Sequence, residues 1–336
     1  MLRLSLIALL ALGFLFVPGA PRPVAAEEGY EIKIATIAPR NSPFMRDFER
    51  LDKRLRQETN GGVRIRLYTS GTAGDERDML RKMRTGQLDS AMITSDGLGL
   101  VLPEVNVLRA PGVVNTYKEL EAVQKVMLPE FDRSFEGKGF KLIAWGEAGE
   151  YHYFSREPVH QLADIRKMRP WLWPASPIMR ETWLAIGAVP VPLSMAEVYG
   201  AIQTRMVDLV ESTPIAYMAL QWHRTDLAYV TEQTSGALVG AWLMNKGMFD
   251  KLKPEWRQSM MRLAEENNQA TRLRTRDGDK KAYDLLVKRG LKVTKYTPSG
   301  QQQLVAIRKQ VRERLVGRVY SADLLARVLK VASGAR

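Results

Sequence analysis

The residues best suited to bind a ligand in this chain are two tryptophans, Trp171 and Trp173. Side chains two positions apart on a strand share a face, so both indoles can form one flat apolar wall that carries N–H donors. A Gly- and Pro-rich turn over 186–193 and an apolar run that ends in Ser212-Thr213-Pro214 follow. This order of residue types predicts one wall of a small-molecule cleft.

Catalytic and metal-binding patterns are not found in the sequence. His152, His160 and His223 are scattered without the spacing of metal ligands, and no zinc motif, nucleophile elbow or phosphate-binding glycine loop occurs. The chain has no cysteine, which excludes thiolate metal sites and a disulfide framework. We therefore expect a binding protein rather than an enzyme, with no metal and no cofactor.

The first 26 residues have the features of a secretory signal peptide. Arg3 precedes a nearly unbroken apolar stretch over 4–17, and Val24-Ala25-Ala26 supplies the small residues that signal peptidase needs. The apolar stretch is short for a membrane anchor, the alternative interpretation. We expect cleavage near residue 26 and a mature chain in the periplasm.

The charge balance does not indicate a nucleic-acid partner. The formal net charge of +13 becomes +11 when Arg3 and Arg22 are removed, since no acidic residue precedes Glu27. Lys and Arg alternate with Asp and Glu along the expected helices, and no dense basic run or nucleic-acid-binding signature occurs. A solvated basic surface is the better interpretation.

The order of elements predicts an α/β fold. Strands expected at 31–38, 63–68 and 91–93 alternate with helices over 44–55 and 75–84, and this rhythm favours parallel pairing through helical crossovers. The rhythm restarts with strands at 168–173, 189–191 and 209–212. Further expected elements are separate helices over 117–127 and 131–135, a strand pair at 227–231 and 238–245, and one long helix over 254–290 in which Gly278 would kink the axis.

Several motifs resemble one family, the substrate-binding proteins of TRAP transporters (the DctP type). The resemblance is carried by the segments 71–76 and 86–89, by the block over 162–222, and above all by 184–193, by 197–203 and by Met206-Val207-Asp208. It covers nearly all of the mature chain. It implies a periplasmic receptor that closes on a small-molecule ligand by hinge motion and delivers it to the TRAP membrane permease subunits.

The resemblance also implies the architecture: an α/β periplasmic-binding-protein fold of two lobes, with the cleft between them and a long spanning helix. We expect residues 29–150 plus about 236–275 to form the first lobe. Residues 151–235 plus about 276–334 would form the second lobe and the C-terminal helices.

The chain departs from this family at the positions that hold the ligand. Family members bind a ligand carboxylate with an arginine. Counting from Asp164, the position of that arginine is occupied by Trp171 in this chain. Arg169 matches the preceding lysine and would reach the cleft only if the register slipped. A second family arginine falls on Tyr151, and a family asparagine falls on Ser212. The chain therefore resembles a branch with a Trp-x-Trp strand that is suited to apolar or aromatic ligands.

We expect the ligand to be largely apolar or aromatic, with or without a carboxylate. For several of these residues a purely structural role is the alternative: Ser212 and Thr213 can simply begin a helix, and Trp183, Trp242 and Trp256 are expected in the core. The predicted binding residues are Trp171, Trp173, Tyr151, Ser212, Thr213, Arg169, Arg40, Asn41, Trp145 and Trp222.

Two alternatives stay open at the level of the sequence. The first is an ordinary organic-acid receptor of the same family, anchored by Arg169 or Arg40. The second is a periplasmic chaperone for lipids or other hydrophobic ligands, which would work with a helical-repeat partner.

Overall fold

The computed structural model describes residues 29–335, and the predicted signal peptide lies outside the described residues. The strands and helices of the first half are β1 (Tyr30–Thr36), α1 (Pro43–Glu58), β2 (Val63–Tyr68), α2 (Glu76–Arg84), β3 (Ser90–Thr94), α3 (Ser95–Leu98), the 3-10 helix η1 (Pro103–Arg109), α4 (Tyr117–Gly137), β4 (Phe140–Glu150) and β5 (His152–Ser155). Those of the second half are α5 (Leu162–Arg166), β6 (Trp171–Leu172), α6 (Pro177–Ile186), β7 (Val191–Pro192), α7 (Val198–Gln203), β8 (Leu209–Ser212), α8 (Pro214–Ala219), the 3-10 helix η2 (Trp222–Arg224), β9 (Tyr229–Thr231), β10 (Ala237–Asn245), α9 (Lys246–Lys251), α10 (Pro254–Lys288), β11 (Lys292–Thr294), α11 (Pro298–Leu315) and α12 (Ala322–Gly334).

The first lobe is built on a five-stranded sheet in the order β2-β1-β3-β10-β4. β1 pairs in parallel with β2 and β3, while β10 lies antiparallel between β3 and β4. Apolar side chains cover both faces, as buried parallel strands require. One face packs against α1 and the start of α10, and the other packs against α2, α4 and α12.

The second lobe has a four-stranded sheet in the order β11-β9-β5-β8 and a separate short pair, β6 with β7. The chain passes from the first sheet to the second at Tyr151, between β4 and β5, and returns between β9 and β10. The two crossing segments are bonded to each other, because Tyr151 donates its N–H to Gly236 and accepts one from Ser235, both at 2.8 Å. The two-lobed α/β fold expected from the sequence is thus confirmed.

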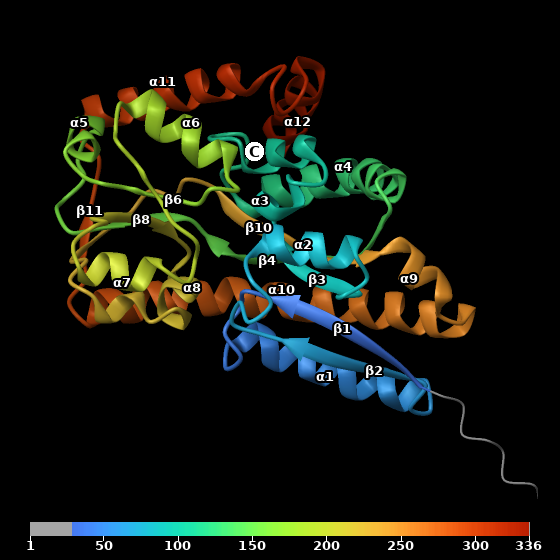
Figure 1. Cartoon of the computed structure of the whole chain (residues 1–336). Helices are drawn as coiled ribbons and strands as arrows, with labels where there is room; N and C mark the ends of the chain where they lie inside the picture. Colours follow the sequence, from blue (N-terminus) through green and yellow to red (C-terminus); the bar gives the residue numbers. More distant parts are fainter. Residues whose placement is uncertain (1–28, 336) are drawn as a thin grey trace, which may run out of the picture.

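Helix α10 spans the molecule. It continues for 35 residues without interruption at Gly278, and at 1.5 Å per residue it is about 52 Å long. It packs against α1 and β4 of the first lobe and against α8 of the second, and Figure 1 shows it crossing the molecule from the side of α9 to the side of α7. Within residues 29–335 no helix is long and apolar enough to cross a membrane.

Three local expectations were wrong. The strands expected at 227–231 and 238–245 do not pair, since β9 joins the second sheet and β10 the first. The two helices expected around residue 129 are one helix, α4, with Pro129 inside it. The C-terminal helices do not all pack on the second lobe: α11 lies on α6, but α12 packs against α4 of the first lobe (Figure 1).

Candidate functional site

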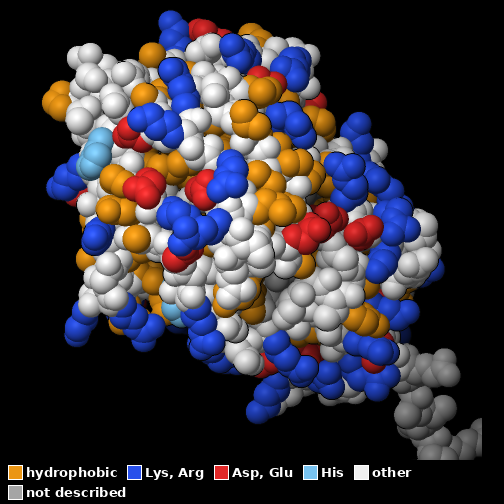
Figure 2. All heavy atoms as spheres, turned by 60° about the vertical axis from the view of Figure 1, so that its left-hand side comes forward, with side chains coloured by type: hydrophobic (Ala, Val, Ile, Leu, Met, Phe, Trp, Pro, Cys, Tyr) orange, Lys and Arg blue, Asp and Glu red, His pale blue; other side chains and the backbone are white. Residues whose placement is uncertain are grey.

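A cavity of about 430 Å³ lies between the two lobes. The first lobe lines it with α1 and with parts of β3, β4 and β10. The second lobe contributes the ends of β6 and β8 and one side of α8, and the middle of α10 also lines the cavity. In Figure 2, orange apolar side chains gather near the centre of the face shown, while blue Lys and Arg side chains are spread around its margins.

Three tryptophans form an aromatic wall on the second-lobe side of the cavity. The rings of Trp171 and Trp173 are stacked, with centroids 6.2 Å apart and planes 21° apart, and Trp222 meets Trp171 edge to face at 5.6 Å. The indole N–H of Trp171 donates to the carbonyl of Leu193 at 2.9 Å. All three tryptophans line the cavity and are nearly fully buried, so this wall is rigid and mainly apolar.

Tyr151 and Trp145 also line the cavity, in different ways. Tyr151 lies at the crossing between the lobes, and the guanidinium of Arg109 stacks on its ring with the carbon 4.5 Å from the ring centroid. Burial raises the pKa of the Tyr151 hydroxyl, which therefore stays neutral. The ring of Trp145 packs with Phe131 and Phe135 of α4, with both centroid distances at 6.5 Å. Trp145 is thus chiefly a core residue of the first lobe.

A buried arginine joins the lobes at the inner end of the cavity. Arg109, at the end of η1, contacts Asp96 of the first lobe at 3.3 Å and Glu211 of β8 at 2.6 Å. Burial alone lowers the pKa of Arg109, but the two carboxylates outweigh it and the pKa is raised. Burial likewise raises the pKa of Asp96. The positive charge of Arg109 is therefore already compensated by carboxylates within the protein.

Glu76 is a third buried acidic group in the lining of the cavity. It begins α2 and is 1% exposed, and its carboxylate accepts the N–H of Thr94 at 2.7 Å and the Thr94 hydroxyl at 2.9 Å. Burial raises the pKa of Glu76 to about 8. Glu76 therefore lies both at the N-terminus of a helix and in the lining of the cavity.

Ser212 and Thr213 line the cavity where β8 leads into α8. The Thr213 side chain accepts the N–H of Ala216 at 3.3 Å and caps the helix, as Ser, Thr, Asp and Asn commonly do. The Ser212 hydroxyl donates to the Thr213 carbonyl at 3.2 Å. The helix-entry role of Thr213 is therefore real, and both residues remain predicted ligand contacts.

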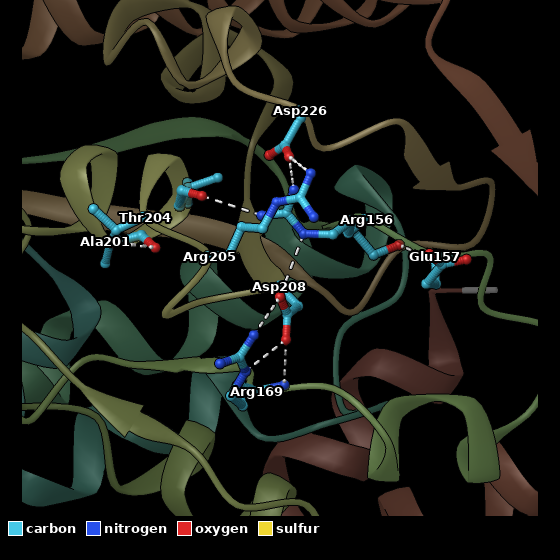
Figure 3. Close-up of polar contacts among 10 residues, drawn as sticks. Arg156, Glu157, Arg169, Ala201, Thr204, Arg205, Asp208 and Asp226 are labelled. Carbon is cyan, nitrogen blue, oxygen red and sulfur yellow. Dashed lines mark hydrogen bonds and ion pairs between the residues drawn. The ribbon is translucent and has the colours of Figure 1, made fainter.

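The three remaining predicted residues do not line the cavity. Arg169 is exposed and binds the Asp208 carboxylate through Nε at 2.8 Å and a terminal nitrogen at 3.1 Å (Figure 3). The register slip that would bring Arg169 inward does not occur, because Trp171 occupies the inward position. Arg40 and Asn41 are exposed in the turn after β1.

The residues that the sequence interpretation missed are charged ones. Arg109, Asp96 and four arginines on α1 and α10 line the cavity. Arg109 alone gave a local signal, a single charge within the run Val107-Leu108-Arg109-Ala110-Pro111. The sequence around the arginines of α1 and α10 is typical of an ordinary solvated helix surface. Among residues 29–335, no group of acidic and histidine side chains could hold a metal ion.

The family model for "bacterial extracellular solute-binding protein, family 7" (DctP) matches residues 34–317. This chain belongs to that family. It is thus a solute-binding protein of TRAP transport systems, a class whose members bind small ligands and serve membrane permeases. The resemblance noted in the motifs is confirmed.

Relatives of this family 7 protein include periplasmic receptors. It is 27% identical over 282 residues to the 2,3-diketo-L-gulonate-binding periplasmic protein of Escherichia coli, covering 82% of this chain and 84% of the relative. A TRAP solute-binding protein from Ralstonia eutropha with bound (S)-2-acetolactate superimposes with a TM-score of 0.84 at 23% identity, over 90% of this chain and 99% of that one. A sugar-acid-binding protein from Advenella mimigardefordensis in complex with galactonate gives 0.85 at 16% identity, over 92% and 99%.

Proposed function

We propose that this protein is the periplasmic receptor of a TRAP-type transporter and binds a small molecule with a largely apolar or aromatic body. The ligand would lie against Trp171, Trp173 and Trp222, and lobe closure around it would present it to the membrane permease. Closure of this kind requires contacts that exist only in the closed state.

The observation that carries the proposal is the place of Trp171. Its indole lies in the aromatic wall that lines the cavity, and counting along the motif from Asp164 predicts a carboxylate-binding arginine at this position in the family. A bidentate arginine is the usual partner of a carboxylate, and the one buried arginine nearby, Arg109, is already bound to Asp96 and Glu211. The inner end of the cavity thus favours neutral, flat ligand groups.

The second candidate is a receptor for an organic acid, and a specific observation favours it. The relatives from Ralstonia eutropha and Advenella mimigardefordensis hold (S)-2-acetolactate and galactonate, both carboxylates. Neither Arg169 nor Arg40 lines the cavity, so a carboxylate would need another anchor. A hydrophobic-ligand chaperone with a helical-repeat partner is the candidate from another class.

The deciding experiment is native mass spectrometry of gently purified full-length mature protein, followed by extraction and identification of what is bound. An apolar or aromatic compound supports the proposal, and quenching of tryptophan fluorescence on re-addition would place it near the aromatic wall. A short hydrophilic acid that binds the purified protein tightly would overturn the proposal in favour of the organic-acid receptor. Arg169→Gln is the control, since Arg169 lies outside the cavity and this change should leave binding unaltered.

A further inference from the structure

Four arginines stand around the opening of the cavity. Arg46 and Arg50 lie one helical turn apart on α1, and Arg272 and Arg274 lie on α10, which packs directly against α1. All four line the cavity, yet they also reach solvent: the side chains of Arg50 and Arg274 are 60% and 54% exposed. They therefore mark the end of the cavity that opens to water, which we call the arginine rim.

The arginine rim carries more positive charge than its neighbours compensate. Asp47 is the one carboxylate of α1 that lines the cavity, and it is shared between Arg50 and Arg274, with Arg274 at 3.3 Å. Arg272 is 3.9 Å from Glu121, which is bound more closely by Arg276 at 2.6 Å. Two more positive than negative charges remain at the rim when Asp47 and Glu121 are both counted.

Arg46 is the member of the rim that is most available to a ligand. Its guanidinium donates to the backbone carbonyl of Asn41 at 2.9 Å, and no carboxylate is within ion-pair distance of it among residues 29–335. A guanidinium group that donates one N–H to a neutral carbonyl keeps most of its five N–H donors for an incoming anion.

The interior of the cavity has the opposite character. Glu76, Asp96 and Glu211 are buried there, and Arg109 is the single cation among them. Burial disfavours an anionic group at that end, and Arg109, the one cation there, is already bound to Asp96 and Glu211. Apolar side chains also line the cavity, among them Phe44, Phe48, Trp242, Ile215 and Leu220.

We propose that the ligand is an anionic amphiphile whose apolar body fills the cavity and whose acidic head group lies outermost, held by Arg46 and Arg274 of the arginine rim. This inference rests on the proposed function and adds an orientation and a head group to it. A cavity of about 430 Å³ falls within the roughly 300–1,000 Å³ of ligand pockets, and a medium-chain fatty carboxylate has the required form.

The test compares decanoate with 1-decanol, two probes with the same chain and different head groups. Binding to the mature protein is measured by isothermal titration calorimetry at low ionic strength. We expect decanoate to bind roughly ten times more tightly than 1-decanol, a difference typical of one charge-assisted contact. Butyrate, which has the head group without the apolar body, should bind weakly.

Matched variants locate the head group. The double variant Arg46→Gln/Arg274→Gln should lose the preference for decanoate, a change of roughly tenfold, and keep its affinity for 1-decanol. Arg54→Gln is the control: Arg54 lies on the same helix α1, pairs with Glu266 at 2.8 Å and does not line the cavity. Circular dichroism of each variant checks that it is folded.

The outcomes separate this inference from the proposed function. Equal binding of both probes, unchanged in the double variant, overturns the arginine-rim inference and leaves an apolar receptor. Tight binding of butyrate with no binding of either long probe overturns both. Binding of the protein to anionic lipid vesicles without binding of monomeric decanoate would assign the arginines to a membrane surface, and would also overturn the inference.

Discussion

Arg109 illustrates how a single buried side chain can hold two lobes together. Its two carboxylate partners come from different lobes, Asp96 from the first and Glu211 from the second. Ser235, in the segment that returns the chain to the first lobe, donates to the other oxygen of Glu211 at 2.5 Å. Arg109, which a ligand carboxylate would be expected to bind, therefore stabilises the contact between the two lobes instead.

Replacing Arg109 should lower the stability of the folded protein. We expect Arg109→Met to lower the free energy of unfolding by about 3–5 kcal/mol, because Asp96 and Glu211 would remain buried without a cation. Urea denaturation followed by circular dichroism measures the change. Arg169→Gln is the matched control: it also removes an arginine paired with a carboxylate, but the Arg169 side chain is 53% exposed, so the loss of stability should be much smaller. Equal losses in the two variants would contradict this account.

At the scale of residues, the sequence predicted correctly which side chains line the cavity where the position within a motif decides the direction of the side chain. Trp171, Tyr151 and Ser212 were predicted by counting along family motifs, and Trp173 because it shares a strand face with Trp171; all four line the cavity. Their role as ligand contacts stays a prediction. Arg109 was missed because its partner Glu211 is 102 residues away in the chain, and the spacing of residues in a sequence does not reveal such a pair.

At the scale of elements, the start of α2 contains a proton-sensitive contact. Burial raises the pKa of Glu76 to about 8, so the folded state holds a proton that the unfolded chain releases near pH 4.5. The contribution of the Glu76 carboxyl to the free energy of unfolding is fully present below the pKa of the unfolded chain. It is lost as the pH rises through the pKa that Glu76 has in the folded state.

The substitution Glu76→Gln should therefore stabilise the protein in a pH-dependent way. Glutamine stays neutral and can still accept the N–H of Thr94. The free energy of unfolding of the variant minus that of the wild type should be small at pH 5 and should grow by up to about 1.4 kcal/mol per pH unit toward pH 8. Urea titrations at pH 5, 6.5 and 8 measure it. A difference that does not vary with pH would contradict the raised pKa.

A second element-scale contact ties α10 to both lobes. One oxygen of Asp279 accepts the N–H of Glu150 at the end of β4, and the other accepts the N–H of Ile215 at the start of α8, both at 2.9 Å. Gly149 makes room for this approach: it has φ +99°, and a Cβ there would lie 2.4 Å from the carboxyl group.

Removing the Asp279 carboxyl should weaken the junction between the lobes. Asp279→Ala leaves two backbone N–H groups without their partner, and we expect a loss of about 1–3 kcal/mol for each that stays buried. Amide hydrogen exchange at Glu150 and Ile215 should accelerate together, whereas Asp277→Ala, on an exposed face of the same helix, should change neither. Exchange that accelerates at only one of the two positions would show that the contact does not couple the lobes.

Element types were predicted better than element partners. The periodic patterns of α1, α2 and α10 predicted these helices because their apolar stripes record burial directly. The strands β9 and β10 were also expected, but as a pair. Adjacent strands usually do pair. Here, however, Gly236 lies where the chain crosses between the lobes, so the following strand enters the other sheet.

At the scale of the whole molecule, the separation of charge within the cavity predicts how binding responds to salt. The exposed arginine rim is open to counterions, whose screening length is about 10 Å at 0.1 M ionic strength. We expect decanoate binding to weaken as sodium chloride is raised from about 20 to about 300 mM, while 1-decanol binding does not weaken. Calorimetric titrations at three salt concentrations measure the slope.

The cause of any such salt effect needs one further comparison. The chain has a formal net charge of +13, and a basic molecule attracts anions over long distances. If the Arg46→Gln/Arg274→Gln variant shows the same slope as the wild type, the effect belongs to the overall charge and not to the arginine rim.

The position of α12 has a consequence for the order in which the chain can fold. Its apolar residues Leu324, Leu325 and Val328 belong to the same core as Val123 and Phe131 of α4, although the two helices are far apart in the sequence. Contacts between distant segments form late, because the loop between them must first be closed at an entropic cost. Until α12 docks, the apolar side chains of α4 that it covers would be exposed to water, and a variant that lacks α12 would keep them exposed.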